Sequence, residues 1–194
     1  MPELARQLGV GTTSVYWYFR NKDELLRAIG DRATEEFYAG LDDDTGLRGD
    51  DRILQHFRVF WSRLRENPLW REVFISGFWR TVSTSEKGAA RAANVHHRQV
   101  TRMMAAGLSV ADATNAYTIL SAYTRGYVMV EHLRSADALP TTRAEMTAEV
   151  HGLAGYGEIE RAAASANPNE TFELGLRALW SGLLRKAEVT AAVC

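Results

Sequence analysis

The sequence predicts an all-α protein, with a small helical domain at residues 1–40 followed by a larger helical domain at residues 41–194. Apolar residues recur every three or four positions along most of the chain, and no segment alternates as a β-strand does. Glycine, proline and asparagine separate the periodic segments, as expected for helix boundaries. Hydrophobic residues make up 46% of the 194 residues, which is enough to form a sizeable core.

The small domain is predicted to contain two short helices and one longer helix. Gly9 ends the first, because glycine readily adopts the left-handed conformation that lets a chain turn. Asn21 can cap the third helix, with Glu24 closing a capping box. The predicted helices span residues 2–8, 12–19 and 22–38.

The first two helices have the sequence pattern of a helix-turn-helix, which joins two helices through a short turn containing glycine. The small side chain of Ala5 permits close approach where the helices cross. The apolar positions expected to hold the pair together are Leu4, Leu8, Val10, Val15 and Tyr18, with Phe19 also interpreted as core. The second helix would then lay its first turn into a DNA major groove.

The residue types at this turn suit DNA. The hydroxyls of Thr12, Thr13 and Ser14 can bond to base edges or phosphates. Tyr16 and Trp17 can lie against the sugar-phosphate wall. Because Lys22 begins the next helix, it would combine a cation with the positive end of the helix dipole, which favours phosphate. Aromatic residues at helical spacing more often form core, and Asn21 with Glu24 can be a helix cap alone.

The larger domain is predicted from further periodic segments. Ile53, Phe57 and Phe60 recur along one helix face. Pro68 suits a first helical turn, and Ser109 an N-cap. The loop AGLDDDTGLRGDD precedes the first of these helices. The predicted helices cover residues 51–67, 68–75, 86–106, 109–134, 143–151 and 170–186.

The stretch ELARQLGVGTTSVYWYFRNKDELLRAI, residues 3–29, resembles the DNA-binding domain of the tetracycline-repressor (TetR) family of transcriptional regulators. VYWYFRNKDELL is its most specific part, and the final helix TFELGLRALWSGLL is a looser match. By this resemblance Thr12, Thr13 and Ser14 would read bases, Tyr16 and Trp17 would contact backbone and bases, and Lys22 would bind phosphate. The resemblance implies a homodimer that binds double-stranded operator DNA, most simply as a repressor.

The sequence departs from the family pattern in two places. Gly11 stands where members usually have a serine or another polar cap. The family also has a whole helix before the one that begins near Pro2, so we expect that the start at Met1 is truncated by about 30 residues, a length implied by the resemblance. The alternative is a small-molecule-binding helical protein that has lost DNA binding. The family's central helices surround an effector cavity, which implies a small hydrophobic or aromatic effector.

The aromatic and methionine content of the larger domain exceeds that of a minimal core. Pockets are mostly apolar with a few polar anchors. His96, His97, Asn115 and Arg125 are candidate anchors, although each is at least as well explained without a ligand. The helices at 109–134 and 170–186 have broad apolar faces suited to a four-helix dimer interface. The predicted effector pocket comprises Phe57, Trp61, Phe74, Phe78, Met103, Tyr117, Tyr123, Arg125 and Tyr127.

Other functional classes have little support in the sequence. Asp42–Asp44 lack the spacing of a calcium loop, and the glycines at 152–157 lack that of a dinucleotide loop. His96 and His97 are adjacent and point about 100° apart on a helix, which argues against a shared metal site. We therefore expect no catalytic site, metal or cofactor. The single cysteine, Cys194, and the lack of a membrane-length apolar run predict a cytoplasmic protein without intramolecular disulfides.

Overall fold

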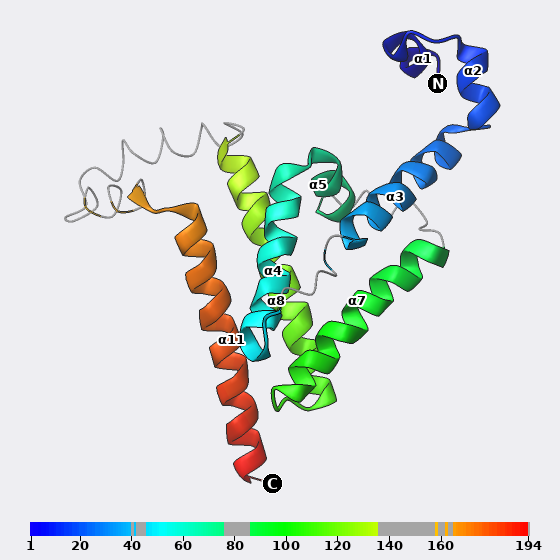
Figure 1. Cartoon of the computed structure of the whole chain (residues 1–194). Helices are drawn as coiled ribbons and strands as arrows, with labels where there is room; N and C mark the ends of the chain where they lie inside the picture. Colours follow the sequence, from blue (N-terminus) through cyan, green and yellow to red (C-terminus); the bar gives the residue numbers. More distant parts are fainter. Residues whose placement is uncertain are drawn as a thin grey trace. The chain divides into compact units, whose positions relative to one another are not determined.

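The computed structural model describes residues 1–39, 41, 46–75, 86–135, 158, 162 and 165–193. Over these residues the regular structure is helical and contains no strand, which confirms the all-α prediction (Figure 1). The helices are α1 (Pro2–Leu8), α2 (Thr12–Tyr18), α3 (Lys22–Ala39), α4 (Gly49–Glu66), α5 (Pro68–Phe74), α7 (Glu86–Ala105), α8 (Val110–Ser135) and α11 (Pro168–Val193).

Most predicted helix boundaries agree with these bounds to within two residues. The helix start signals act as expected: the Asn67 side chain accepts a hydrogen bond from the Leu69 N–H at 2.9 Å, and Ser109 Oγ accepts one from the Asp112 N–H at 3.1 Å. The predicted end of the last helix at Lys186 is wrong, because α11 continues to Val193. The predicted helix at 143–151, Phe78 and Cys194 lie outside the described residues.

Backbone contacts divide the chain into two compact units. The first unit comprises Met1–Gly46 and Ser62–Gln99, and the second comprises Leu47–Trp61 and Val100–Cys194. The divisions fall inside α4 and α7, so both of these helices contribute to both units. The domain boundary near residue 40 remains a prediction.

An aromatic cluster joins α3 and α5 in the first unit. Phe37 is completely buried, and its ring lies 4.3 Å from that of Phe74 and 5.7 Å from that of Trp70. The Arg63 guanidinium covers the Trp70 ring at 4.3 Å and donates a hydrogen bond to the Glu36 carbonyl at 2.7 Å. This combination of cation–π contact and carbonyl capping fixes the carboxyl-terminal turn of α3.

The core of the second unit lies between α4, α8 and α11. α8 and α11 pack along each other (Figure 1). Each of these two helices also buries several apolar side chains. Phe57, Leu120 and Leu176 are completely buried, one from each helix. In the part of the chain that the structure describes, none of the helices is long and apolar enough to cross a membrane.

Candidate functional sites

The turn between α1 and α2 has the predicted conformation. Gly9 is left-handed, with φ 68° and ψ 26°. The Val10 N–H donates a hydrogen bond to the Ala5 carbonyl at 3.0 Å, which closes the end of α1. Ala5 is 1% exposed, as expected for the position where the two helices approach most closely. The helix-turn-helix prediction is therefore confirmed at the level of fold.

The first turn of α2 presents polar side chains to solvent. Thr12, Thr13 and Ser14 are all exposed. Gly11 provides no side-chain cap, but its carbonyl accepts the Ser14 N–H at 3.0 Å, so the helix begins at the predicted place. Val15 is buried and holds α2 onto α1. The first turn of α2 therefore exposes three hydroxyls, while the buried Val15 packs the opposite face of the helix into the protein.

Three aromatic residues of α2 are exposed: Tyr16 at 45%, Trp17 at 83% and Tyr18 at 72%. The prediction that Tyr18 belongs to the core is wrong. The described part of the pair buries α2 mainly through Val15, and Tyr18 instead meets the Trp17 ring edge to face at 5.8 Å. Leu8 and Val10, also interpreted as core, are likewise exposed.

The start of α3 is capped largely as predicted. Asn21 Oδ1 accepts the Glu24 N–H at 2.8 Å. The Glu24 carboxylate accepts the Arg20 N–H at 2.8 Å, one residue before the N-cap that a regular capping box would use. Lys22 is exposed at the first position of α3, and Asp23 stands in the same turn. The nearby carboxylates reduce the positive potential available to a phosphate at this helix end.

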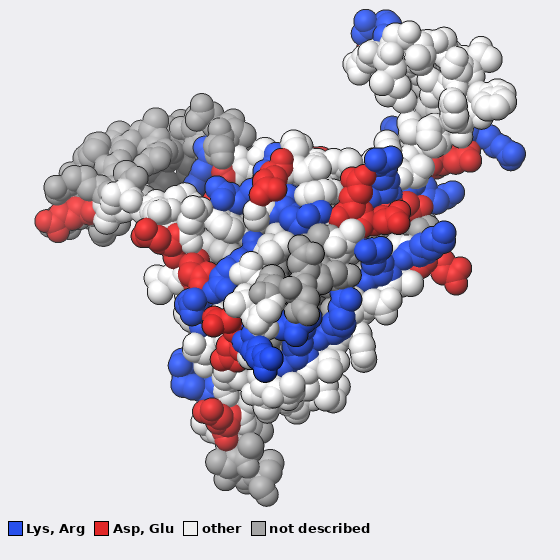
Figure 2. All heavy atoms as spheres, in the orientation of Figure 1, with Lys and Arg blue, Asp and Glu red and all other residues white. Residues whose placement is uncertain are grey.

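The charge of the α1–α2 pair is small. Arg6 forms an ion pair with Glu3 on the surface of α1, which offsets its charge. Figure 2 shows few charged side chains on the visible face of this helix pair. Arg20 and Lys22 follow α2 and are the next basic side chains along the sequence after its exposed turn. Any affinity for DNA through these helices must therefore come substantially from the hydroxyls and aromatic rings, as well as from charge.

An aromatic stack forms in the second unit around Phe172. The Phe172 ring lies parallel to Trp61 at 4.4 Å and nearly parallel to Tyr123 at 5.5 Å. Tyr127 meets it edge to face at 5.4 Å. Trp61 donates its ring N–H to Glu131 at 3.0 Å, and the Tyr123 hydroxyl donates to the Phe172 carbonyl at 3.1 Å. Three predicted effector residues are thus brought together, with a phenyl ring between them.

A second cluster lies between α4 and α8, centred on His56. This imidazole is 4% exposed and lies 4.9 Å from the Phe57 ring and 6.0 Å from the Tyr117 ring. Neither ring nitrogen has a hydrogen-bond partner among the described residues. Burial, and to a smaller extent the charge of Arg102, lowers the pKa of His56 from 6.5 to about 3. The ring is therefore a neutral donor and acceptor in an aromatic environment.

The remaining predicted effector residues divide between several places. The Arg125 guanidinium lies 5.2 Å from the centre of the Phe60 ring, beside the His56 cluster, and Met103 is completely buried. Phe74 belongs to the first unit, where it packs on Phe37. The candidate anchors His97 and Asn115 are exposed, whereas His96 is half-buried. No group of potential metal ligands occurs among the described residues.

His56 is the polar residue that the sequence-based prediction missed. It lies three residues after Ile53 and four residues before Phe60, and therefore on the same helix face as both. That spacing could have identified it, because a histidine within an apolar stripe is carried into the core. A buried polar group without a partner is rare and calls for a specific explanation.

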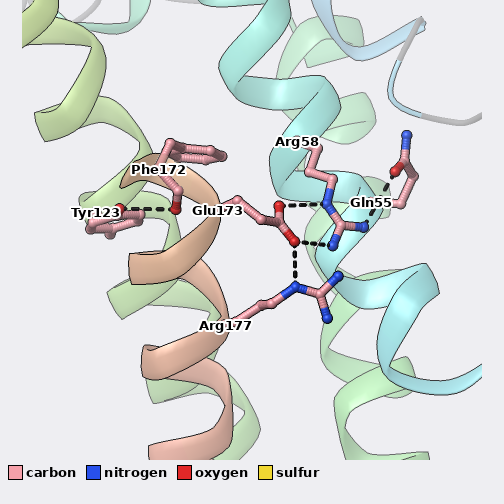
Figure 3. Close-up of polar contacts among 6 residues, drawn as sticks. All are labelled: Gln55, Arg58, Tyr123, Phe172, Glu173 and Arg177. Carbon is pink, nitrogen blue, oxygen red and sulfur yellow. Dashed lines mark hydrogen bonds and ion pairs between the residues drawn. The ribbon is translucent and has the colours of Figure 1, made fainter. Parts of the chain in front are cut away.

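An ion-pair network joins α4 to α11 in the second unit (Figure 3). Arg58 donates to both carboxylate oxygens of Glu173, at 2.6 and 2.8 Å, and Arg177 donates to the same carboxylate at 2.5 Å. Gln55 accepts a further, longer bond from Arg58 at 3.5 Å. The hydrogen bond from Arg58 is the main cause of the lowered pKa of Glu173. The forked geometry fixes one helix against the other more firmly than a single contact would.

Replacing Glu173 with Gln is expected to lower the free energy of unfolding by about 1 kcal/mol, because two guanidiniums lose their shared carboxylate while remaining partly exposed to water. Urea unfolding followed by circular dichroism would measure this. Glu170→Gln is a suitable control, since Glu170 is exposed on the same helix and accepts a hydrogen bond from the Asn167 side chain at 3.2 Å but forms no ion pair within the described residues. An equal loss in both variants would show that the network contributes nothing specific.

The outer faces of α8 and α11 leave large apolar side chains exposed. The most exposed are Val110 at 61% on α8, and Leu174 at 71% and Val189 at 66% on α11. Val128 of α8 is 1% exposed and therefore belongs to the core of the second unit rather than to this face. The further exposed apolar residues on α8 are Ile119, Met129 and Val130.

Comparisons with known proteins identify the family. Residues 1–29 match the model of the bacterial regulatory proteins of the tetR family. Residues 76–187, more than half of the chain, match the tetracyclin repressor-like carboxyl-terminal domain. The chain belongs to the tetR family. The resemblance to this family inferred from the sequence is thereby confirmed for both the amino-terminal and the carboxyl-terminal part of the chain.

Relatives of this tetR-family chain include proteins named as transcriptional repressors. The HTH-type transcriptional repressor Rv1353c of Mycobacterium tuberculosis is 32% identical over 133 residues, which cover 69% of this chain and 49% of the relative. The tetracycline repressor protein class A from transposon 1721 of Escherichia coli is 28% identical, over 98% of this chain and 83% of the relative. This chain thus spans about half the length of the first of these relatives.

Solved structures agree on the fold. TetR from Acinetobacter baumannii AYE superposes with a TM-score of 0.65 at 20% identity, covering 95% of this chain and 86% of its own. A possible TetR family transcriptional regulator from Streptomyces coelicolor superposes with a TM-score of 0.61 at 21% identity, covering 94% of this chain and 87% of its own. A variant of the Acinetobacter protein in complex with minocycline superposes with a TM-score of 0.50 at 19% identity, covering 95% of this chain and 84% of its own.

Proposed function

We propose that this tetR-family protein is a sequence-specific DNA-binding transcriptional regulator, acting most simply as a repressor. The supporting observation is the surface of α2, where Thr12, Thr13, Tyr16 and Trp17 are exposed while Val15 anchors the helix from behind. Hydroxyl and aromatic side chains on one short helix can enter a major groove and contact bases and phosphates. The related repressors of Mycobacterium and Escherichia coli support the same function.

The regulator is proposed to be a cytoplasmic homodimer without enzymatic activity. The exposed apolar side chains of α8 and α11 would be buried by a second copy of the chain. A dimer places two recognition helices at a fixed separation, so the operator is expected to be a near-palindrome. The alternative, a ligand-binding protein without DNA binding, is favoured by the exposure of Leu8 and Val10, because their apolar surface lies uncovered beside the proposed DNA reader.

A small, largely hydrophobic effector is proposed to shift the spacing of the two DNA readers and release DNA. The complex of an Acinetobacter TetR variant with minocycline supports the binding of a small molecule by a protein of this fold. Here the neutral His56, with Phe57, Tyr117 and Arg125 beside it, would supply the polar anchor. An effector acts only through its difference in affinity for the DNA-binding and non-binding states. A preference of about 3 kcal/mol would weaken operator binding roughly a hundredfold.

Fluorescence anisotropy tests the proposal directly. Labelled DNA from the gene's own upstream region is titrated with the chain at two salt concentrations and challenged with unlabelled random DNA. Salt-sensitive binding that resists the competitor supports a sequence-specific regulator. Binding lost equally to random DNA would contradict it. If no binding is seen, the measurement is repeated with residues added upstream of Met1, and a second failure would favour the ligand-binding alternative.

Substitutions on the proposed DNA surface are expected to weaken binding without altering the fold. Trp17→Ala should reduce operator affinity about tenfold or more by removing a large exposed contact. Tyr16→Phe should cost about threefold through the lost hydroxyl. Lys22→Ala should weaken binding to all DNA sequences similarly. It should also reduce by about one the slope of the logarithm of the binding constant against the logarithm of the salt concentration.

Lys87→Ala is the matched control for Lys22→Ala. Lys87 is exposed in the first turn of α7, so its loss changes the net charge equally at a helix start outside the α1–α2 pair. Anisotropy with operator and random DNA would compare the two variants. If Tyr16→Phe and Lys22→Ala both bind as the wild type does, the proposed placement of the DNA contacts is wrong.

A further inference from the structure

A cleft in the second unit combines positive charge with a small apolar wall. Its volume is about 460 Å³, within the size range of sites for small organic molecules. Three helices form it: the start of α4, the end of α7 and the carboxyl-terminal part of α11. Its charged lining residues are Arg48, Asp50, Arg52, Arg102 and Glu188.

The charges of the lining residues favour an anion. Three guanidiniums face two carboxylates, from Asp50 and Glu188, which leaves one net positive charge. The amino-terminal end of the 18-residue helix α4 also opens here at Gly49, and the partial positive charge of a helix start adds to that of the arginines. Arginine presents a planar fork that matches both carboxylate and phosphate oxygens.

A buried polar group lies one turn beyond the cleft. His56 follows Arg52 by four residues and therefore shares its face of α4. It is 4% exposed, and its two ring nitrogens have no hydrogen-bond partner among the described residues. Arg102, which lines the cleft from α7, is close enough for its charge to act on this imidazole. Two arginines that line the cleft, Arg52 and Arg102, are thus close to an imidazole that has no hydrogen-bond partner among the described residues.

We propose that this cleft binds a small organic anion bearing a carboxylate or phosphate group, held by Arg52 and Arg102. The apolar part of the ligand would lie against Ala105, Ala106 and Leu184. Arg52 and Arg102 already have interaction partners within the protein. The oxygens of a bound anion would take the place of these partners. Because Arg102 also acts on His56, occupation of the cleft alters the field at the proposed effector anchor. Binding to the cleft itself requires neither DNA nor an effector.

Isothermal titration calorimetry of the whole chain tests the proposal with benzoate and phenyl phosphate as anionic probes and benzyl alcohol as the neutral probe. Saturable binding of either anion, with benzyl alcohol at least tenfold weaker, is expected. A preference between benzoate and phenyl phosphate identifies which anionic group the cleft takes. Equal binding of the neutral probe, or no saturable binding of either anion, overturns the proposal.

Variants locate the binding. Arg52→Gln and Arg102→Gln are each expected to weaken the better probe about tenfold, whereas Glu188→Gln should strengthen it about threefold by removing a repelling carboxylate. Arg185→Gln is the matched control, because Arg185 is exposed on α11 beside Leu184 but does not line the cleft. Circular dichroism and size-exclusion chromatography verify fold and assembly. Equal weakening in Arg185→Gln, or weaker binding in Glu188→Gln, would contradict the assignment.

Discussion

Lowering the pH from 7 to 5 is expected to reduce the free energy of unfolding by about 2 kcal/mol through His56 alone. The pKa of this imidazole is about 3 in the folded protein, compared with 6.5 for an exposed histidine. Between these two values the unfolded chain binds a proton that the folded chain does not. Keeping His56 neutral in the fold therefore costs almost nothing above about pH 6.5, and this cost to the free energy of unfolding grows as the pH falls toward 3.

Urea unfolding at pH 7, 6 and 5, followed by circular dichroism at a fixed protein concentration, measures the dependence. The His56→Leu variant should have a much flatter slope over this range, because the titrating group is gone. At pH 7 the substitution should be nearly neutral or stabilising, since it removes a buried polar group without a described partner. A large loss of stability at pH 7 would show instead that the imidazole makes a strong interaction in solution.

His132→Gln serves as the control because His132 is exposed on α8. A slope that flattens as much in His132→Gln as in His56→Leu would show that the effect is not specific to the buried imidazole. Glu173 has a lowered pKa and contributes its own pH dependence only below its ordinary value of 4.5, outside the range measured. A slope that persists in His56→Leu would rule out His56 as its source.

The sequence predicted those features of the fold that depend on neighbouring residues. Gly9 marked a left-handed turn, and Asn21 and Ser109 marked helix starts, because caps and turns are set by local hydrogen bonds. The end of α11 was missed for a physical reason. Residues with weak helix propensity near Val189 each cost a few tenths of a kcal/mol, and a long helix can propagate through them.

Features set by tertiary packing were harder to predict. Tyr18 has the same helical periodicity as a core residue, but burial requires a partner surface, and Tyr18 is exposed. The effector candidates Trp61, Tyr123 and Tyr127 were chosen for their aromatic character, yet their grouping around Phe172 depends on how α4, α8 and α11 pack. Long-range contacts of this kind leave no periodic signal in one sequence.

Replacing Gly175 with Ala is expected to destabilise the protein by about 1–3 kcal/mol, although alanine favours helix more than glycine does. A methyl group on Gly175 would lie 2.2 Å from the Tyr123 hydroxyl oxygen and 2.7 Å from the adjacent ring carbon. The Tyr123 ring has little freedom to move, because it stacks on Phe172 and its hydroxyl donates to the Phe172 carbonyl. The glycine thus allows α8 to approach α11 closely.

Gly182→Ala provides a control of opposite sign. Gly182 lies on the same helix, and apart from its chain neighbours and the nearby helix backbone no atom of the described residues stands within 4 Å of the position its methyl group would take. This variant should be stabilised by up to about 1 kcal/mol through helix propensity alone. Urea unfolding of both variants at one protein concentration compares them on an equal footing, since the proposed dimerisation would add a concentration-dependent contribution. Stabilisation of both would show that the Tyr123 side chain yields easily.

A double substitution separates the steric clash from other effects of Gly175→Ala. Tyr123→Phe removes the nearest atom and, by itself, should cost about 1 kcal/mol for the lost hydrogen bond to the Phe172 carbonyl. In that background the cost of Gly175→Ala should fall by about 1 kcal/mol, because the remaining ring carbon can shift once the hydroxyl no longer holds it. An unchanged cost would place the strain in the helix backbone. A reduced cost would show that one glycine and one tyrosine set the separation of α8 and α11, the helices proposed to form the dimer.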